Sequence, residues 1–279
     1  LGSNITKAGK IGKPIVKDGL VLKHGYTRGP VQPCSTGAAD INADAAADEY
    51  IDVGAIVMGT GDISVSAWVY VTTWVTNAGI FTNRLNSGTY PGISVRHKNG
   101  VQRFEVNIDD GGSSTAIESD LKNANQWYHV CTVLDRSGLG YLYIDGVLED
   151  SASITSENLT LAHADNAFIG KNEGTLEHRG YICNVGYWNA ALTQPQIKSI
   201  MHKDYAALSA SEKTGLVSWW NLDSTIPGVS TEVYDNHYAG GSELGSELIT
   251  NGNFSSASGW TLSADAGDST AEISGGTLN

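Results

Sequence analysis

The sequence predicts an all-β protein, an antiparallel two-sheet jelly-roll sandwich with one or two short helices near its C-terminal end. The chain has 279 residues, and its 33 glycines, 12 tyrosines and 7 tryptophans contrast with only 17% charged residues. This composition is typical of proteins rich in strands and turns. Short apolar or alternating segments recur about every 8 to 12 residues, the spacing of a sandwich. Finally, residues 127–150 are predicted to form three strands, because turn-forming residues separate them.

The segment 127–150 predicts an antiparallel meander. Its first strand, 127–135, is rich in aromatic and β-branched residues and ends at a polar cluster with Gly138. The second strand, 139–144, ends at Asp145-Gly146, a dipeptide that tolerates positive φ at both central positions of a type I′ turn. Val147 therefore begins the returning strand.

The other strands are predicted in order along the chain. Residues 63–72 alternate, so that Ile63, Val65, Ala67, Val69 and Val71 share one aliphatic face that packs on the core. Asn99-Gly100 is a second hairpin dipeptide. Further strands are expected at 48–53, 79–83, 92–97, 101–108, 115–119, 166–170, 180–188 and 215–223.

Two helical segments follow the strands. Thr193 can cap a helix over 193–202, with Pro195 in its first turn, where a missing N–H costs nothing. Ser209 and Glu212 fit a capping box and predict one further short helical turn.

Charge and composition divide the chain into four parts. Residues 1–37 form an extended basic arm, 38–223 the sandwich, 224–246 a linker, and 247–279 the start of a second β module. Within residues 1–30, six basic residues accompany the single acid Asp18, although the whole chain carries a net charge of −13. An acidic body repels nucleic acid and anionic membrane, and the arm could dock on an acidic partner or simply be solvated. No apolar run approaches the roughly 20 residues of a membrane span.

The three cysteines show no metal-binding spacing. Cys131 and Cys183 lie within apolar strands, and we expect them to be buried free thiols. Cys34 lies in the basic arm.

The order of the strand motifs resembles the laminin G-like domains of the concanavalin A-like lectin and glucanase superfamily. The motifs that carry this resemblance are ISVSAWVYV, NQWYHVCTVLD, GYLYIDGVL, NAFIGKN and GYICNVGYWNAALTQPQIKSIM. Together they cover about residues 38–206. The resemblance implies a jelly roll that binds ligands through its rim, often with calcium. Cys183 departs from the pattern, because the family often has an acid there.

The C-terminal segment resembles the opening of another family. ELITNGNFSSASGW is similar to the start of galactose-binding-like carbohydrate-binding modules. A basic leader, a laminin G-like sandwich and such a tail together resemble structural proteins of marine bacteriophages, such as tail fibres. The resemblance implies a virion protein that is extracellular, although a secreted or cell-surface bacterial protein remains an alternative.

The sequence lacks the motifs of the common catalytic sites. Retaining glycosidases need two carboxylates about 5 to 5.5 Å apart, and no E-x-D-x-x-E string supplies them. Asp48 and Asp52 share a strand face, whereas Glu49 points to the opposite one. No G-x-S-x-G elbow and no phosphate-binding loop occurs. His129 is predicted to be packed, and we expect no enzyme.

Loops at the rim supply the candidate binding residues. Asn107, Asp109 and Asp110 could hold calcium, although Asp-Asp-Gly-Gly is also ordinary turn chemistry. A second rim set comprises Lys171, Asn172, Glu173, Glu177, His178 and Arg179. Aromatic platforms for a sugar could be Trp74, Tyr90, Tyr187 or Trp188, each of which could equally be core.

These observations predict a non-enzymatic virion protein that binds a cell-surface glycan and contacts other virion proteins through its arm. The alternative is a purely structural capsid or fibre subunit, with a glycosidase less favoured still. A homo-oligomer is compatible with either function, but no heptad repeat supports one.

Overall fold

The computed structural model describes most of residues 32–223 and three short pieces beyond them. Residues 36, 42–48, 85–90, 99, 164 and 173–175 lie outside the description, and after residue 223 it covers 235–237, 273–274 and 277–278. Most of the predicted arm and second β module, and almost all of the predicted linker, therefore lie outside the described residues. No helix within the described part is long and apolar enough to cross a membrane.

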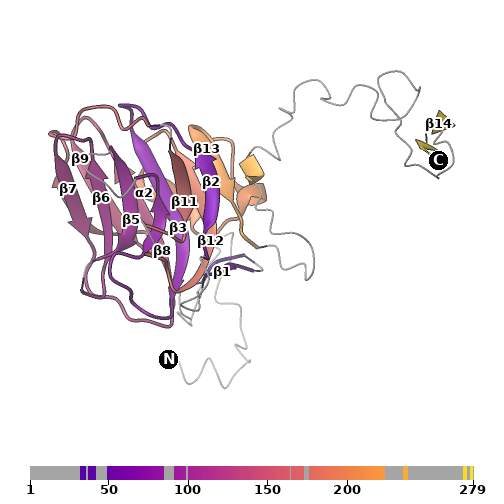
Figure 1. Ribbon diagram of the computed structural model, residues 1–279, viewed down its shortest axis with the longest axis horizontal. Helices are drawn as coiled ribbons and strands as arrows, with labels where there is room; N and C mark the ends of the chain where they lie inside the picture. Colours follow the sequence, from indigo (N-terminus) through magenta and orange to yellow (C-terminus); the bar gives the residue numbers. More distant parts are fainter. Residues whose placement is uncertain are drawn as a thin grey trace, which may run out of the picture.

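Two antiparallel sheets lie face to face and form the sandwich that the sequence predicts (Figure 1). The seven-stranded sheet comprises β1 (Ala39–Ile41), β12 (Gly180–Trp188), β3 (Ile63–Val71), β8 (Trp127–Leu134), β9 (Leu139–Ile144) and β10 (Val147–Ser153), in that order, with β13 (Leu216–Trp220) also paired to β12. The six-stranded sheet has the order β2 (Ile51–Ala55), β11 (Asn166–Ile169), β4 (Gly79–Thr82), β5 (Gly92–His97), β6 (Phe104–Asp109) and β7 (Ser114–Glu118).

The predicted meander is confirmed as β8, β9 and β10. Asp145 and Gly146 have φ values of +53° and +72°, the left-handed conformations that a type I′ turn requires. The short strand β1 was not predicted, because the sequence around it is rich in alanine and polar residues. A two-stranded ribbon pairs β14 (Ile273–Ser274) with β15 (Thr277–Leu278).

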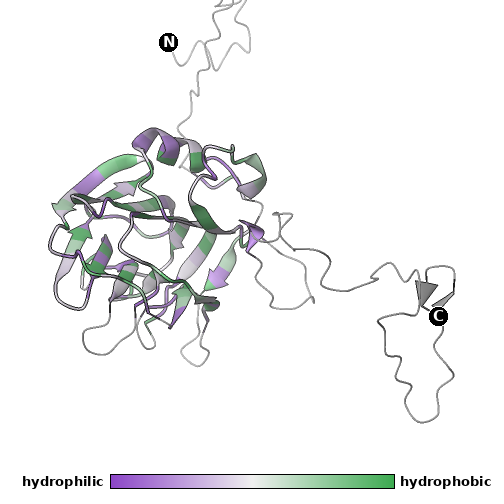
Figure 2. Ribbon diagram, turned by 90° about the horizontal axis from the view of Figure 1, so that it is seen from above, coloured by the Kyte–Doolittle hydropathy of each residue, from purple (hydrophilic) through white to green (hydrophobic). Residues whose placement is uncertain are grey.

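The main core lies between the two sheets. Its side chains come from alternate positions of the strands, and hydrophilic and hydrophobic segments alternate along them in Figure 2. Val69, Phe81, Val106 and Ile169 are 0% exposed, and each such side chain contributes roughly 1.5 to 3 kcal/mol on burial.

The outer face of β3 is also buried, which the alternating sequence did not predict. Helix α2 (Gln194–Ile200) and the segment after it cover this face, and Trp68 packs there against Cys183 and Met201. The Trp68 indole donates a hydrogen bond from Nε1 to the carbonyl of Met201 at 2.9 Å. A further cluster under α2 joins Cys131, Trp188 and Ile197. The seven-stranded sheet is therefore covered on both faces.

The helical predictions are confirmed in part. Thr193 is the N-cap residue of α2, and its N–H donates to the side-chain oxygen of Gln196 at 2.9 Å. Ser209 donates from its backbone N–H to the Glu212 carboxylate at 2.7 Å, as a capping box requires. This segment nevertheless forms a turn, and the short 3-10 helix η1 (Tyr205–Ala207) precedes it.

Candidate functional site

The outer face of the six-stranded sheet is polar. The side chains of β5 and β6 that point into the core are Ile93, Val95, Phe104, Val106 and Ile108. The alternate side chains therefore point outward. The polar residues of this outer surface, which we call the polar face, are Asp52, Thr82, Ser94, Arg96, Glu105, Asn107, Asp109 and Glu118.

One row of outward-pointing side chains, which includes the apolar Phe168 and Ala116, crosses all six strands. Successive pairs of neighbours are Asp52 and Phe168, Phe168 and Thr82, Thr82 and Ser94, Ser94 and Asn107, and Asn107 and Ala116. Because directly paired residues point to the same side of a sheet, these side chains lie next to one another. The row therefore brings together residues between 52 and 168 that the linear sequence separates.

Asn172 extends this row from the loop after β11. The Ser94 hydroxyl donates a hydrogen bond to Asn172 Oδ1 at 2.7 Å, and both residues are buried. The Asn172 Nδ2 group is also buried and has no hydrogen-bond partner among the described residues. A buried amide N–H without a partner costs about 1 to 3 kcal/mol, so a polar ligand group at this position would be stabilising.

Ionic contacts cover the middle of the polar face. Glu105 is 2% exposed and pairs with Arg96 at 2.7 Å and with Lys98 at 2.9 Å. Lys98 also contacts Glu118 at 2.5 Å. Hydrogen bonds to Glu105 and Glu118 raise the pKa of the Lys98 ammonium group. Lys98 thus joins the carboxylates of two neighbouring strands.

An aromatic pair marks the end of the row at β2 and β11. The rings of Tyr50 and Phe168 meet edge to face with centroids 5.4 Å apart. The ammonium nitrogen of Lys171 lies 3.8 Å from the centroid of the Tyr50 ring, a cation–π distance. Tyr50 is 36% exposed. Its position two residues before the outward-pointing Asp52 was the sequence signal that could have identified this ring.

Comparison with known protein families identifies the sandwich. Residues 44–198 match the family described as the concanavalin A-like lectin/glucanases superfamily, which is more than half of the chain. The chain belongs to this superfamily. No curated protein matches the chain.

Several solved structures are similar to the chain at low sequence identity. A heptameric SAP-like pentraxin from Limulus polyphemus has 15% identity and a TM-score of 0.48, covering 59% of this chain and 80% of its own. A protein from Bacteroides ovatus, named as a proposed carbohydrate binding protein, has 17% identity and a TM-score of 0.48, with coverages of 67% and 53%. The receptor binding domain of botulinum neurotoxin D has 16% identity and a TM-score of 0.46, with coverages of 58% and 42%. The chain thus spans about half or less of the latter two proteins.

The residues predicted to hold calcium do not fit a cation. Arg84 donates to Asn107 Oδ1 at 3.0 Å and to Asp109 Oδ2 at 2.8 Å, so a guanidinium group already lies where a calcium ion would need these oxygens. Asp110 Oδ1 accepts the backbone N–H groups of Gly112 and Ser113, both at 2.9 Å. The described residues contain no group of three acidic, histidine or cysteine side chains placed to hold a metal ion.

Asp110 acts as a turn residue, the alternative that the sequence left open. Its second oxygen accepts the N–H of Leu159 at 3.0 Å. Burial alone would raise the pKa of Asp110, but the backbone N–H groups of Leu159, Ser113 and Gly112 lower it below its ordinary value. The carboxylate thus ties the loop after β6 to the segment before β11.

The predicted sugar platforms prove to be core residues where the structure describes them. Tyr187 is 2% exposed and stacks with Phe81 at 6.3 Å, and Trp188 is 0% exposed. The Trp74 ring packs on His97 at 4.7 Å and on Phe104 at 5.1 Å. Tyr187 faces the core between the sheets, Trp188 lies on the opposite face in the cluster beneath α2, and Trp74 is partly buried against the main core. Tyr90 and Glu173 lie outside the described residues.

His178, assigned to a rim loop, is instead buried beside His97. The two residues are 0% exposed, and His178 Nδ1 lies 3.2 Å from His97 Nε2. Their separation in sequence gave no signal of this contact. His129 is buried at 1% exposure, which confirms the expectation of a packed histidine. Cys131 and Cys183 are buried free thiols, also as expected, and Cys34 is exposed.

The polar face does hold neighbouring carboxylates, which the search for a sequence string missed. Glu105 and Glu118 are direct cross-strand partners on β6 and β7. Both contact the same ammonium group of Lys98, however. A glycosidase needs one carboxyl group as proton donor and another as nucleophile or base, which requires different environments. In this structure Glu105 and Glu118 are both held in one ion-pair network by Lys98. Asp52 is bound instead to Asn166 and Gly54.

Proposed function

We propose that the protein is a non-catalytic carbohydrate-binding protein that recognises its ligand on the polar face. One observation carries the proposal: the Tyr50 ring, 36% exposed, lies at one end of a row of mostly polar side chains that reaches Asn107 across the sheet. The inner side chains of this row are buried and support the outer ones. Sugars present an apolar ring face and a rim of hydroxyl groups. A surface with an aromatic ring beside hydrogen-bonding side chains matches both.

Each part of the polar face has a role in this proposal. The face of the Tyr50 ring opposite Lys171 packs on the apolar side of a pyranose, and the Lys171 ammonium group meets a hydroxyl or carboxylate oxygen. Glu105 fixes Arg96 and Lys98, whose side chains remain 16% and 29% exposed and can meet further ligand oxygens. Since the side chains are already held by one another, little conformational entropy is lost on binding.

Binding to a panel of polysaccharides and arrayed glycans tests the proposal. We expect retention of at least one glycan, and Tyr50→Ala should weaken it about tenfold or more, because truncation removes the stacking surface. Tyr50→Phe should retain most of the affinity. Leu139→Ala, at an exposed position of β9 away from the polar face, is the matched control. The proposal would be refuted if no glycan binds, or if Tyr50→Ala and Leu139→Ala lose the same amount of affinity.

We further propose that the glycan belongs to a host cell surface and that the protein is part of a phage tail fibre or similar appendage. The support is the layout of the sequence, with a basic segment 1–37 before an acidic sandwich. Labelled antibodies against the sandwich should decorate virions in electron micrographs. Virions assembled with a version of the protein that lacks residues 1–30 should no longer carry it. If the protein is instead secreted or held on a cell surface, the antibodies should not decorate virions in either experiment. A purely structural subunit would be decorated but would bind no glycan.

A further inference from the structure

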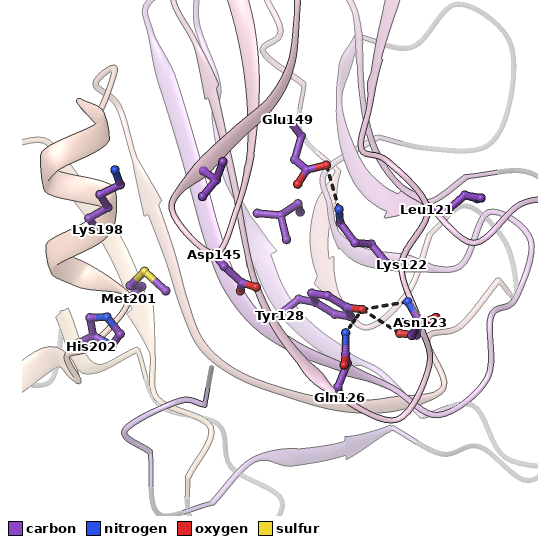
Figure 3. Close-up of a pocket in the computed structure, with 12 residues that line it drawn as sticks. Leu121, Lys122, Asn123, Gln126, Tyr128, Asp145, Glu149, Lys198, Met201 and His202 are labelled. Carbon is purple, nitrogen blue, oxygen red and sulfur yellow. Dashed lines mark hydrogen bonds and ion pairs between the residues drawn. The ribbon is translucent and has the colours of Figure 1, made fainter. Parts of the chain in front are cut away.

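A pocket lies apart from the polar face, beside the end of α2. It has a volume of about 820 Å³ and is bounded by the loop 121–126, the turn between β9 and β10, and the last turn of α2 (Figure 3). It shares no residue with the polar face. Its size falls within the range of pockets that hold small organic ligands, about 300 to 1,000 Å³.

The lining of this pocket is largely apolar. Its hydrophobic residues are Leu121, Tyr128, Ile144, Val147 and Met201. Leu121 is 66% exposed and Val147 57% exposed, so large apolar side chains remain in contact with water at the pocket. Covering such surface gains roughly 25 cal/mol per Å², which favours an apolar ligand body.

The charged groups of the pocket are distributed unevenly. Lys122 and Glu149 pair with each other at 2.8 Å. Lys198 and His202 both come from the side of α2, and the structure shows no acidic partner for either of them among the described residues. Figure 3 shows both on one side of the pocket, across from the Lys122–Glu149 pair.

Asp145 is the remaining acid of the pocket, and it is committed to the protein backbone. Its Oδ1 accepts the N–H of His129 at 2.9 Å. Burial raises the pKa of Asp145 above its ordinary value. Because this hydrogen bond holds Asp145, and Glu149 pairs with Lys122, Lys198 is the charged group of the pocket that has no ion-pair partner among the described residues.

We propose that this pocket binds a small amphiphilic anion, with an apolar body and a single carboxylate or sulfonate group. The apolar body lies against Ile144, Val147 and Met201. The anionic group lies at Lys198 and His202. The proposal assigns a second ligand class to the protein, and it holds or fails independently of carbohydrate binding by the polar face.

Methionine methyl NMR on the full chain gives a direct test, because the chain has only two methionines. Met201 lines the pocket, whereas Met58 is 1% exposed in the core between the sheets and serves as an internal control. Titration with decanoate below its micellar range should shift the Met201 signal saturably and leave Met58 in place. Decyltrimethylammonium should bind at least tenfold more weakly than decanoate.

Two variants locate the binding. Val147→Asp should weaken decanoate binding about tenfold or more, whereas Leu148→Asp, at the neighbouring exposed position that does not line the pocket, should leave it unchanged. Lys198→Gln should weaken decanoate but leave decanol unaffected. No saturable shift of Met201, equal effects of Val147→Asp and Leu148→Asp, or equal binding of the cationic and anionic amphiphiles would overturn the proposal.

Discussion

At the scale of single residues, the buried pair His97 and His178 is the least expected feature of the sandwich. Hydrogen-bond geometry assigns the tautomers. The N–H of Val75 donates to His97 Nδ1 at 3.3 Å, His97 Nε2 donates to His178 Nδ1 at 3.2 Å, and His178 Nε2 donates to the carbonyl of Tyr70 at 3.0 Å. In this arrangement two neutral rings satisfy all four nitrogens. If His97 Nδ1 donated instead to the nearby Val75 carbonyl, two nitrogen lone pairs would face each other.

Burial opposes protonation of this pair, which predicts a pH dependence of stability. Burial lowers the pKa of His178 to about 4 and that of His97 well below its ordinary value, and it lowers the pKa of His129 to about 3. The unfolded chain therefore binds more protons than the folded chain between about pH 6.5 and 4. The free energy of unfolding should fall as the pH falls through this window, by on the order of 2 kcal/mol for each buried histidine.

Urea unfolding at pH 7 and at pH 4.5 measures the effect. Burial would raise the pKa of Glu212, but hydrogen bonds from Lys203, Ser199 and Ser209 lower it to about 2. Glu212 therefore loses its contribution to the free energy of unfolding only below about pH 4.5. The chosen window therefore isolates the histidines. His178→Gln keeps one hydrogen-bond donor and one acceptor but cannot be protonated in this range. It should therefore reduce the difference in the free energy of unfolding between the two pH values. Equal stability of the parent protein at both pH values would contradict the neutral pair.

At the scale of elements, helix α2 has the role of a cover for the seven-stranded sheet. Ile197 is 0% exposed beneath it and packs in the same cluster as Cys131. Burial raises the pKa of the Cys131 thiol, so this thiol reacts only when the cover opens. A disulfide reagent should therefore label Cys34 rapidly, and Cys131 and Cys183 only slowly.

Loosening the cover should change the rate of that slow labelling. Ile197→Ala should destabilise the protein by about 2 to 5 kcal/mol, because it leaves a cavity beneath the helix. It should also speed the labelling of Cys131. Cys34→Ser removes the fast phase and identifies it. A Cys131 that reacts as fast as Cys34 in the parent protein would show that α2 does not protect the sheet.

The strands could be predicted from the sequence because each one carries its own signal. Alternation in β3 and the Asp145-Gly146 turn are local patterns, so no tertiary information is needed to read them. The local sequence pattern does not predict β1, which is only three residues long, and it does not predict that the outer face of β3 is buried. Ser64 and Trp68 look like surface residues in sequence, and only the return of the chain after β12 buries them.

At the scale of the whole molecule, the polar face could not be read from the sequence because it is a product of strand order. The sequence placed Asn107 and Asp109 in a predicted calcium loop and Asn172 in a separate rim set. Their actual partners are Arg84, which follows β4, and Ser94, which lies in β5. Single residues such as Tyr187 were misassigned because an aromatic side chain in a strand has the same sequence signature in a core and in a binding surface.

The edge of the seven-stranded sheet at β13 has an unusual termination, which gives a prediction for the molecule as a whole. The backbone N–H groups of Trp219 and Asn221 point away from β12. They donate to the side chains of Asp235, at 3.0 Å, and Asn236, at 2.9 Å. Side-chain oxygens thus take the place of a neighbouring strand, and they block an edge that could otherwise pair with another chain.

Removing both side chains should therefore leave the edge of β13 free to pair with a strand of another copy of the chain. The double variant Asp235→Ala, Asn236→Ala loses two hydrogen bonds to backbone groups, so the free energy of unfolding should fall by about 1 to 3 kcal/mol. Sedimentation velocity should show a larger share of dimers and higher oligomers than in the parent protein, increasing with concentration. His237→Ala, which alters the adjacent residue, serves as the matched control. If the double variant sediments and unfolds like this control, the two side chains do not protect the edge, and β13 must be shielded by its own twist and sequence.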